Sequence, residues 1–488
     1  MSTEPALVSP EPARGGADAA TRRGRSRRRR GRAFAGAFAV VVGVLAVLGL
    51  GGAALTTVQG PRVTGVQFDP DAAVTASGSR VIFTTSQSLD EVDPSQVSVT
   101  PAADFTVDTS GRSVGLRFAL PLWDDTDYTV RIEGVTGLGG GPAVTIERTL
   151  STPPLQVFIL QRQASGDTVY RTDLAGDAAV PVFTHPHIED FRATAGHLVM
   201  STVDDAGLSH LVVTDLEGDG ERELPLPGEG TVTDLQSADR GNLVGYLFTD
   251  ADIGADSGRE AALFTASLSA SRGDEPPVMV EREGGDSRVD DWRFVPGTDS
   301  MLLLTFDGSL TLVPSEGAPV ALGNAIAIDG IARGSATAIV ERVSGLVAID
   351  LATADETDLP PTDDALGQAW SVIGMPDGSG DTVRVLSKLD AAGITVESTS
   401  VAVVDAEGAA RTVFDVPADA SLMQACVSPS GRYAALLVAP EIVDNAYDGY
   451  QLPLPERLQT HVVSLDDGAE VVALRGFDIS WCQSGPRP

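Results

Sequence analysis

The sequence predicts a chain that is all-β after one N-terminal transmembrane helix, with a small β-sandwich followed by a seven-bladed β-propeller. Three observations predict this fold class. Residues 33–55 contain no charged side chain. After them, short apolar runs alternate with clusters of Gly, Asp, Pro and Ser, which is typical of strands and turns. From residue 155 onward, a strand-like unit recurs at spacings that propeller blades have.

The first element is an arginine-rich tail, residues 1–32, which we expect to be disordered and cytoplasmic. It holds nine arginines against three acidic residues. Residues 33–55 are almost entirely Ala, Val, Leu, Gly and Phe, and a helix of that length spans a hydrocarbon core of about 30 Å. Basic residues beside a span stay in the cytoplasm. We therefore expect a single-pass cell-membrane protein with its N-terminus inside and its domains outside.

The arginine-rich tail has three other possible roles. A nucleic-acid arm is disfavoured because the adjacent apolar span already explains the basic charge. A twin-arginine export signal is disfavoured because "RRRRGRAF" lacks an apolar pair directly after its arginines. A cleaved signal peptide stays open, since "GGAAL" offers small residues to a peptidase.

The composition agrees with an extracytoplasmic location. The formal net charge is −34 although the tail is basic, and such a surface disfavours nucleic acid and anionic lipid. Lys388 is the only lysine. This usage, with abundant Ala, Gly and Val, resembles that of a high-GC actinobacterium.

Residues 61–152 are expected to form a β-sandwich. Their strand-like segments alternate apolar and polar residues, with Val81, Phe83, Leu116 and Phe118 predicted to face inward. The Pro153-Pro154 pair is expected to end this domain, because proline cannot donate to a strand ladder.

The same segment resembles the bacterial Ig-like domain found in surface-layer proteins. The resemblance lies in "RVIFTTSQSLDEVD", "LPLWDDTDYTVRIEGVTGLGG" and "RTLSTPP", which occur in the order of that family. It implies a spacer or adhesion module without catalytic residues. Trp123-Asp124-Asp125 replaces the family's usual Pro-Gly turn, so we expect this corner to differ.

Residues 155–488 are expected to form a seven-bladed propeller. A segment with an acidic residue, a turn and a strongly apolar strand recurs seven times, and we call each copy an opening because it would begin a blade. Examples are "EDFRATAGHLVMST", "DDWRFVPGTDSMLLLTF" and "MQACVSPSGRYAALLV", and the last is "FDISWCQSG". The segment at residues 155–185 supplies three strands but no opening, and "FDISWC" supplies an opening strand alone. The prediction is a last blade shared between both ends, which leaves the ring without exposed edges. Tandem sandwiches are the alternative.

The propeller resemblance is local. "SPSGRYAALLVAP" and "DISWCQSG" resemble blades of periplasmic TolB-type propellers. Cys426 and Cys482 lie at matching places in two neighbouring openings. Because opening strands of neighbouring blades lie side by side and the compartment is oxidising, we expect a disulfide between them.

Candidate sites are few. His185 and His187 are weak candidates for a metal site, and no cofactor is expected. The segment "APEIVDNAYDGYQLPLPERLQTHVV" interrupts the last full blade and gathers acids and aromatics. Long insertions in compact folds are often functional. We expect ligand contact there, or a lid that packs on the propeller. The candidate ligand-binding residues are Asp444, Tyr447, Asp448 and Tyr450.

The sequence favours a non-catalytic binding or assembly module of the cell envelope. Its propeller face would contact an envelope protein or glycan, and it would not bind nucleic acid. The alternative is a propeller-type hydrolase or lyase that acts on cell-wall glycan or peptide, since catalytic residues can converge from separate blades.

Overall fold

A computed structural model describes residues 34–49, 60–176, 179–239, 243–254, 257–281, 284 and 286–486. Residues 34–49 form a helix. The rest of the expected span, the arginine-rich tail and the last two residues lie outside the described residues. Within the described part of the chain, no helix has the length and hydropathy needed to cross a bilayer.

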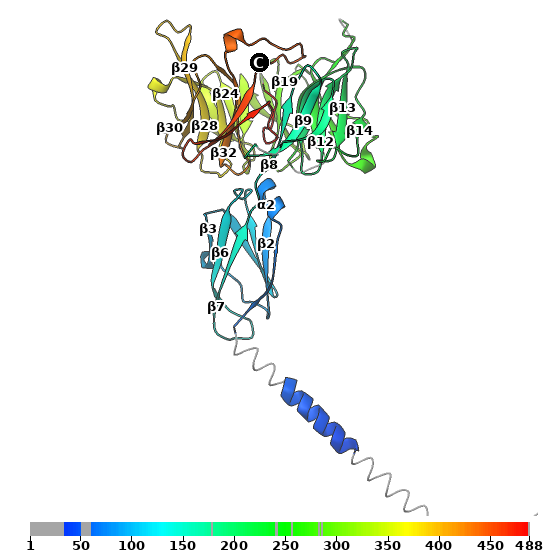
Figure 1. Ribbon diagram of the computed structural model, residues 1–488, viewed down its shortest axis with the longest axis vertical. Coiled ribbons are helices and arrows are strands. Elements are labelled where there is room, and N and C mark those ends of the chain that lie inside the picture. Colours follow the sequence, from blue (N-terminus) through cyan, green and yellow to red (C-terminus); the bar gives the residue numbers. More distant parts are fainter. Residues whose placement is uncertain are drawn as a thin grey trace, which may run out of the picture.

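The β-sandwich consists of two antiparallel sheets that share one core (Figure 1). The sheet with order β1-β2-β5-β4 contains β1 (Val63–Phe68), β2 (Arg80–Thr85), β5 (Ser113–Phe118) and β4 (Phe105–Ser110). The sheet with order β3-β6-β7 contains β3 (Val97–Thr100), β6 (Asp127–Val135) and β7 (Val144–Ser151). Val81, Phe83, Leu116 and Phe118 have no exposed surface, as their alternation predicts.

Two short helical turns join the sandwich strands. The helix α2 (Pro70–Thr75) begins after Asp69, whose carboxylate accepts a hydrogen bond from the Ala72 N–H at 3.1 Å. The 3₁₀ turn η1 (Pro94–Gln96) is closed by a capping box between Asp93 and Gln96.

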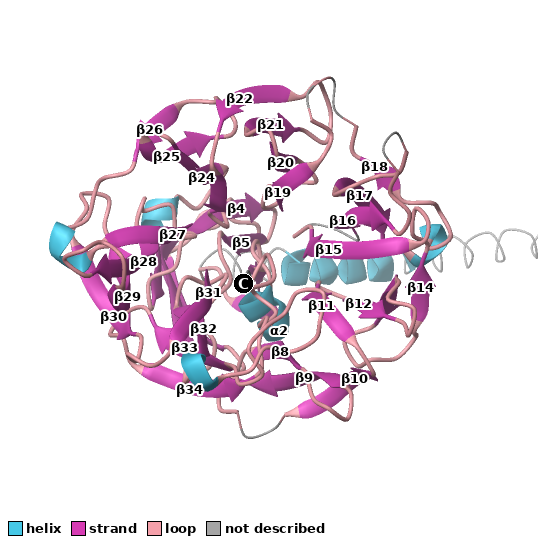
Figure 2. Ribbon diagram, turned by 90° about the horizontal axis from the view of Figure 1, so that it is seen from above, coloured by secondary structure: helices cyan, strands magenta, loops and turns pink. Residues whose placement is uncertain are grey.

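Seven further antiparallel sheets, in the described residues, surround a common centre (Figure 2). We number these blades from β11. Blade 1 contains β11 (Ile188–Ala193), β12 (Leu198–Val203), β13 (Ser209–Thr214) and β14 (Arg222–Leu224). Blade 2 contains β15 (Gly230–Ser237), β16 (Leu243–Asp250), β17 (Ala262–Ser267) and β18 (Val278–Met279), with η2 (Ala270–Arg272). Blade 3 contains β19 (Val289–Phe294), β20 (Met301–Thr305), β21 (Ser309–Val313) and β22 (Val320–Asn324).

The remaining blades complete the ring. Blade 4 contains β23 (Ala327–Ile331), β24 (Thr337–Arg342), β25 (Gly345–Asp350) and β26 (Glu356–Asp358). Blade 5 contains η3 (Asp364–Leu366), β27 (Gln368–Gly374), β28 (Thr382–Leu389), β29 (Val396–Val404) and β30 (Ala410–Asp415). Blade 6 contains β31 (Ser421–Val427), β32 (Tyr433–Ala439), η4 (Ile442–Asp444), β33 (Gln459–Ser464) and β34 (Glu470–Arg475). Blade 7 contains β8 (Gln156–Gln161), β9 (Asp167–Asp173) and β10 (Val180–His185).

The predicted openings are the first strands of blades 1 to 6, which lie nearest the centre (Figure 2). In each of them the pairing with the second strand shifts register once. A bulge bends the strand and redirects side chains. The regular placement of this bulge supports one structural unit repeated around the ring.

The ring closes near the end of the chain, with one departure from the prediction. Phe477 pairs with Leu160 of β8, so blade 7 does receive chain from both ends. However, residues 477–482 form this single bridge and turns, not an opening strand. Gly476 and Asp478 adopt φ angles of 119° and 57°, which are incompatible with an extended strand.

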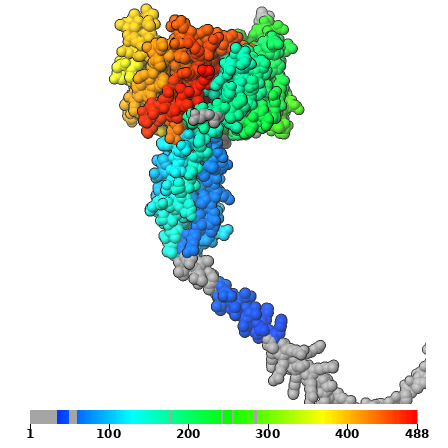
Figure 3. Space-filling model, in the orientation of Figure 1, coloured from blue at the N-terminus to red at the C-terminus, as the bar shows by residue number. Residues whose placement is uncertain are grey.

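The sandwich docks against the propeller through the corner that departs from the Ig-like pattern (Figures 1 and 3). The buried Asp124 carboxylate accepts hydrogen bonds from Arg432 and from the Tyr433 hydroxyl, each at 3.0 Å. The Arg432 guanidinium also lies 5.2 Å from the centre of the Trp123 ring. A Cβ at Gly334, in blade 4, would lie 2.8 Å from the Leu120 side chain. The sandwich thus contacts two separate blades.

Candidate functional sites on the propeller

The two faces of the ring have different hairpins. The turns between first and second strands, which include Gly334 and Arg432, point toward the sandwich. Because neighbouring strands are antiparallel, the hairpins between second and third strands lie at the opposite end. We call this end of the ring the distal face, and its described hairpin residues are 162–166, 204–208, 251–254 with 257–261, 306–308, 343–344, 390–395 and 440–458. The hairpins of blades 5 and 6, yellow to orange, project from this face in Figure 3.

Five of these hairpins, those of blades 2 to 6, each expose a large apolar side chain, and we call them the five distal hairpins; the hairpins of blades 1 and 7 expose none. Val343 is 96% exposed, Val443 93% and Ile394 82%, and about half the surface of Ile253 and of Phe306 is exposed. Large exposed apolar patches mark interaction sites, whereas single exposed apolar residues are common. The feature that distinguishes these five side chains is that all lie at one end of the ring. Among the other exposed apolar side chains of the propeller, Ile326, Trp370, Leu389 and Val396 lie elsewhere on blades 3 to 5. Five more lie on outermost strands, at the rim: Val180, Val278, Met279, Val320 and Val471.

The 440–458 loop, which connects β32 to β33, is anchored to the ring. Leu454 and Leu458 are buried in a cluster with Phe158 and Phe191, which belong to blades 7 and 1. The loop therefore leaves its own blade and covers the seam where the ring closes. The expectation of a lid that packs on the propeller agrees with this arrangement.

A buried arginine fixes the loop to the seam. The side chain of Arg162, which directly follows β8, is 7% exposed and donates to the Asp448 carboxylate at 2.8 Å. Its other guanidinium nitrogen donates to the Glu189 carbonyl at 2.9 Å and lies 3.5 Å from the Glu189 carboxylate. The guanidinium lies 3.8 Å from the centre of the Tyr450 ring and 4.9 Å from that of Phe477.

The four candidate ligand-binding residues divide into two pairs. Asp448 and Tyr450 face the ring, where the Tyr450 hydroxyl lies 2.8 Å from both carboxylate oxygens of Asp167. Burial, reinforced by Asp167, raises the pKa of Tyr450, so its hydroxyl stays protonated and donates. Asp444 and Tyr447 are exposed on the distal face. Of the four residues, only this second pair is exposed.

The two histidines do not converge on a common point. His185 Nδ1 lies 2.9 Å from the His187 carbonyl oxygen. His187 Nε2 lies 2.6 Å from a Glu189 carboxylate oxygen, and its ring packs on Tyr450. Within the described residues no group of three or more His, Cys, Asp or Glu side chains is arranged to hold a metal ion.

The central channel contains a cluster of charged side chains. The buried Arg192 donates to Asp478 and forms an ion pair with Asp190 at 2.9 Å. Burial raises the pKa of Asp190 well above its ordinary value. The positive charge of Arg192 lowers this pKa and the nearby Asp478 raises it, but burial has the largest effect. The chain itself fills part of this space, because the Ser484 carbonyl accepts from Gln424 at 2.7 Å and Gly485 lies beside Arg192.

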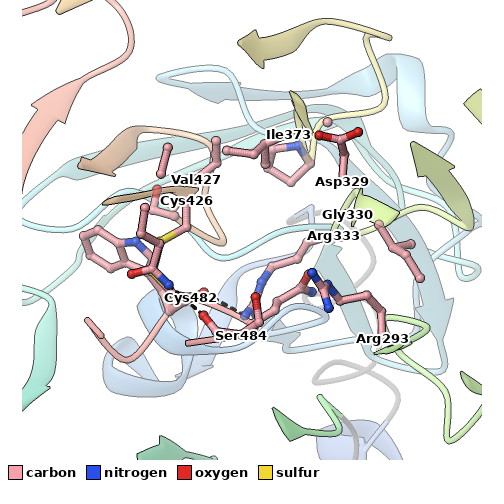
Figure 4. A pocket seen from close by; sticks show the side chains of 17 residues that line it. Arg293, Asp329, Gly330, Arg333, Ile373, Cys426, Val427, Cys482 and Ser484 are labelled. Carbon is pink, nitrogen blue, oxygen red and sulfur yellow. Dashed lines mark hydrogen bonds between the residues drawn. A yellow bond between two sulfur atoms is a disulfide. The ribbon is translucent and has the colours of Figure 1, made fainter. Parts of the chain in front are cut away.

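A cavity of about 80 Å³ is lined by residues of blades 3 to 6 and by residues 481–484 (Figure 4). Its lining includes Arg293, Asp329, Arg333 and Ser484. Arg333 donates to the Trp481 carbonyl at 3.0 Å. Burial raises the pKa of Asp329 to about 6, although its carboxylate accepts a hydrogen bond from the Val372 N–H.

The predicted disulfide between Cys426 and Cys482 is confirmed, with a Cα–Cα distance of 5.5 Å. It borders the cavity and ties β31 to the turn after Phe477. The seam is therefore joined by a covalent bond near the sandwich-facing end of the channel and by Arg162 beneath the distal loop.

Sequence reasoning missed two features that the structure makes prominent. The apolar hairpin tips carried a signal, because Phe306 in "FDG" and Val343 in "RVSG" are large apolar residues inside tight turns, where polar residues are usual. No local sequence signal indicated the role of Arg162, because its partner Asp448 is 286 residues away along the chain.

The chain was compared with known proteins. No protein-family model matches it, and no curated protein matches it. Similar solved structures include a TolB-like protein from Agrobacterium tumefaciens, with 14% identity, a TM-score of 0.32, and coverage of 66% of this chain and 90% of that one. An oligogalacturonate lyase in complex with manganese has 11% identity, a TM-score of 0.42, and coverage of 74% and 95%.

A puromycin-hydrolyzing peptidase from Mycobacterium tuberculosis is also similar, with 14% identity and a TM-score of 0.37. The match covers 77% of this chain and 57% of the peptidase. Scores at this level carry no argument about activity. The propeller-type fold of this chain is supported by its own ring of antiparallel sheets.

Proposed function

We propose that this chain is a membrane-anchored, extracytoplasmic binding or assembly module of the cell envelope, and that its distal face contacts a protein partner. The single observation that carries the proposal is the exposed apolar side chain on each of the five distal hairpins. Apolar side chains that remain in water are stabilised when a partner covers them.

The kind of side chain favours a protein over a glycan. Val343, Ile394, Val443 and Ile253 are aliphatic, and aliphatic tips pack against other apolar side chains. Phe306 and Tyr447 add aromatic surface of the kind enriched in protein interfaces.

The anchoring part of the proposal depends on the sequence. The uncharged residues 33–55 follow a basic tail, which places the tail in the cytoplasm if the segment spans the membrane. The sandwich lies between the helix of residues 34–49 and the ring, on the side away from the distal hairpins (Figure 1). The distal face would then point away from the membrane, toward other envelope components.

The test compares two triple variants of the full chain in cells of the producing organism. Formaldehyde, which can join amines of a partner to arginine and tyrosine side chains of this chain, is applied before isolation of the chain, and crosslinked species are identified by mass spectrometry. We expect charged residues at the hairpin tips to remove a defined species, whereas charged residues at the rim leave it. The tip variant combines Val343→Asp, Ile394→Asp and Val443→Asp, and the rim control combines Val180→Asp, Val278→Asp and Val471→Asp. Equal yields from both variants would refute the proposal.

A hydrolase or lyase remains the second candidate, and one observation favours it. Asp190 has a raised pKa beside a second carboxylate, which is an arrangement that acid–base catalysts use. An enzyme of this kind would release sugar or peptide fragments from purified cell wall. Release by the full chain that Asp190→Asn abolishes would support catalysis, and no release would leave binding as the function.

A further inference from the structure

The distal hairpins pair each exposed apolar side chain with an acidic one close in sequence. All of these acids lie on the same five hairpins or at the ends of their strands. The pairs are Asp252 with Ile253, Phe306 with Asp307, Glu341 with Val343, Asp390 with Ile394, and Val443 with Asp444.

These acids are not neutralised by the protein itself. The basic side chains of the same face already have other partners: Arg259 pairs with Asp250, Arg288 with Asp286 and Glu260, Lys388 with Glu397, and Arg457 with Glu441. Over the described part of the chain, no ion pair includes Asp252, Asp307, Glu341, Asp390 or Asp444.

Two of the acids are held in the ionised form by the hairpins. Hydrogen bonds from the Thr305 hydroxyl and the Ser309 N–H lower the pKa of Asp307. The Ile394 N–H does the same for Asp390, at 2.9 Å. Both carboxylates therefore keep their negative charge at neutral and mildly acidic pH.

We infer that the partner presents basic side chains together with apolar ones to the distal face, as a cationic protein segment does. This inference rests on the proposed protein-binding role of that face. Negative charges beside apolar tips attract cationic groups and repel other acidic surfaces. A second copy of this chain, with its net charge of −34, and an anionic lipid surface are both disfavoured by the same repulsion.

Two peptide probes test the inference. The full chain is reconstituted in phosphatidylcholine nanodiscs, and empty nanodiscs serve as the blank. One fluorescent peptide repeats Lys-Val-Thr, and its twin repeats Glu-Val-Thr, so that only the charge differs. We expect the lysine peptide to bind about tenfold more tightly at low salt, and its advantage to shrink at high salt because exposed charges are screened.

Matched amide variants locate the effect, since an amide keeps the hydrogen-bond acceptor and removes the charge. We expect the distal variant to lose about fivefold or more in affinity for the lysine peptide. The control variant, altered on the sandwich-facing turns, is expected to bind as the unaltered chain does. The distal variant combines Asp252→Asn, Asp307→Asn, Glu341→Gln, Asp390→Asn and Asp444→Asn, and the control combines Asp219→Asn, Glu275→Gln, Glu316→Gln, Glu407→Gln and Asp466→Asn.

Equal affinities of the two variants, or of the two peptides, would overturn the inference. The protein-binding role itself is judged separately, by the crosslinked species that the aspartate tip variant removes. If that species is lost while the two peptides bind alike, the distal face binds a protein but the partner is not cationic.

Discussion

Arg162 links parts of the chain that are far apart in sequence. It contacts Asp448 and Tyr450 of the 440–458 loop, Glu189 of blade 1 and the ring of Phe477. A buried ion pair is costly to break, because the remaining charge loses its partner without regaining water. The side chain therefore acts as a structural joint beneath the distal face.

Replacement of Arg162 is expected to destabilise the propeller. In the Arg162→Met variant the largely buried Asp448 and Glu189 carboxylates lose the guanidinium that lies between them, and the free energy of unfolding should fall by about 3 kcal/mol. Urea denaturation of the full chain measures this change. The exposed pair of Arg171 and Glu217 provides the control, since Arg171→Met should cost less than about 1 kcal/mol. Similar losses in the two variants would contradict the account.

Asp329 makes stability depend on pH. Its pKa of about 6 in the folded chain lies above the ordinary value of 3.8, because burial disfavours the ionised form. The folded chain therefore binds the proton more tightly than the unfolded chain. The unfolding free energy is undiminished below the ordinary pKa, and it falls as the pH rises through about 6.

The Asp329→Asn variant should lack this penalty. Its amide oxygen can still accept from the Val372 N–H, so the hydrogen bond is kept. We expect the variant to gain stability over the unaltered chain between about pH 4 and 6 and to exceed it by about 1–3 kcal/mol at higher pH. Urea titrations across this range measure the difference, and exposed Asp108→Asn is the control. A difference that does not change with pH would refute the assignment.

At the scale of elements, local patterns in the sequence were informative where neighbouring residues determine structure. Alternation predicted that Val81 and Leu116 face inward, and the recurring openings predicted the first strands of blades 1 to 6. The turns after Phe477 were not predicted, because the φ angle of Asp478 depends on the site into which it packs. The inward direction of Asp448 likewise depends on Arg162, which no local pattern reveals.

The disulfide is expected to hold the last turn of the chain to blade 6. Cys426 and Cys482 are 56 residues apart, and a crosslink of this length stabilises by about 4 kcal/mol through the entropy of the unfolded chain. The Cys426→Ala, Cys482→Ala double variant should melt at a lower temperature than the oxidised chain. A reducing agent should lower the melting temperature of the unaltered chain alone. If both respond alike to the reductant, another group is responsible.

At the scale of the whole molecule, the sandwich and the ring form one elongated body (Figure 3). The joint at Asp124 and Arg432 fixes which face of the ring the sandwich contacts. The sequence indicated this place only as a departure at Trp123-Asp124-Asp125, because the blades that meet it come from distant parts of the chain.

The proposed topology predicts which residues are accessible from outside the cell. Ser344→Cys, on an exposed distal hairpin, should react with a membrane-impermeant maleimide in intact spheroplasts. Ser26→Cys, in the arginine-rich tail, should react only after permeabilisation. Each substitution is made in an otherwise unaltered chain, where the native cysteines form the disulfide and do not react with the maleimide. Labelling of Ser26→Cys in intact spheroplasts would contradict the topology, and a secreted form that starts near Leu55 would establish cleavage.

The most direct test of the central claim is a map of the partner's position on the propeller. A photo-crosslinking amino acid is placed at one position at a time in the full chain, and adducts are compared after irradiation of intact cells. If the distal face binds a protein, we expect one protein adduct that the distal positions share and that is absent from the rim positions. An adduct at the rim, or none at the distal positions, would contradict it. The distal positions are Val343, Ile394 and Val443, and the rim positions are Val180, Val278 and Val471.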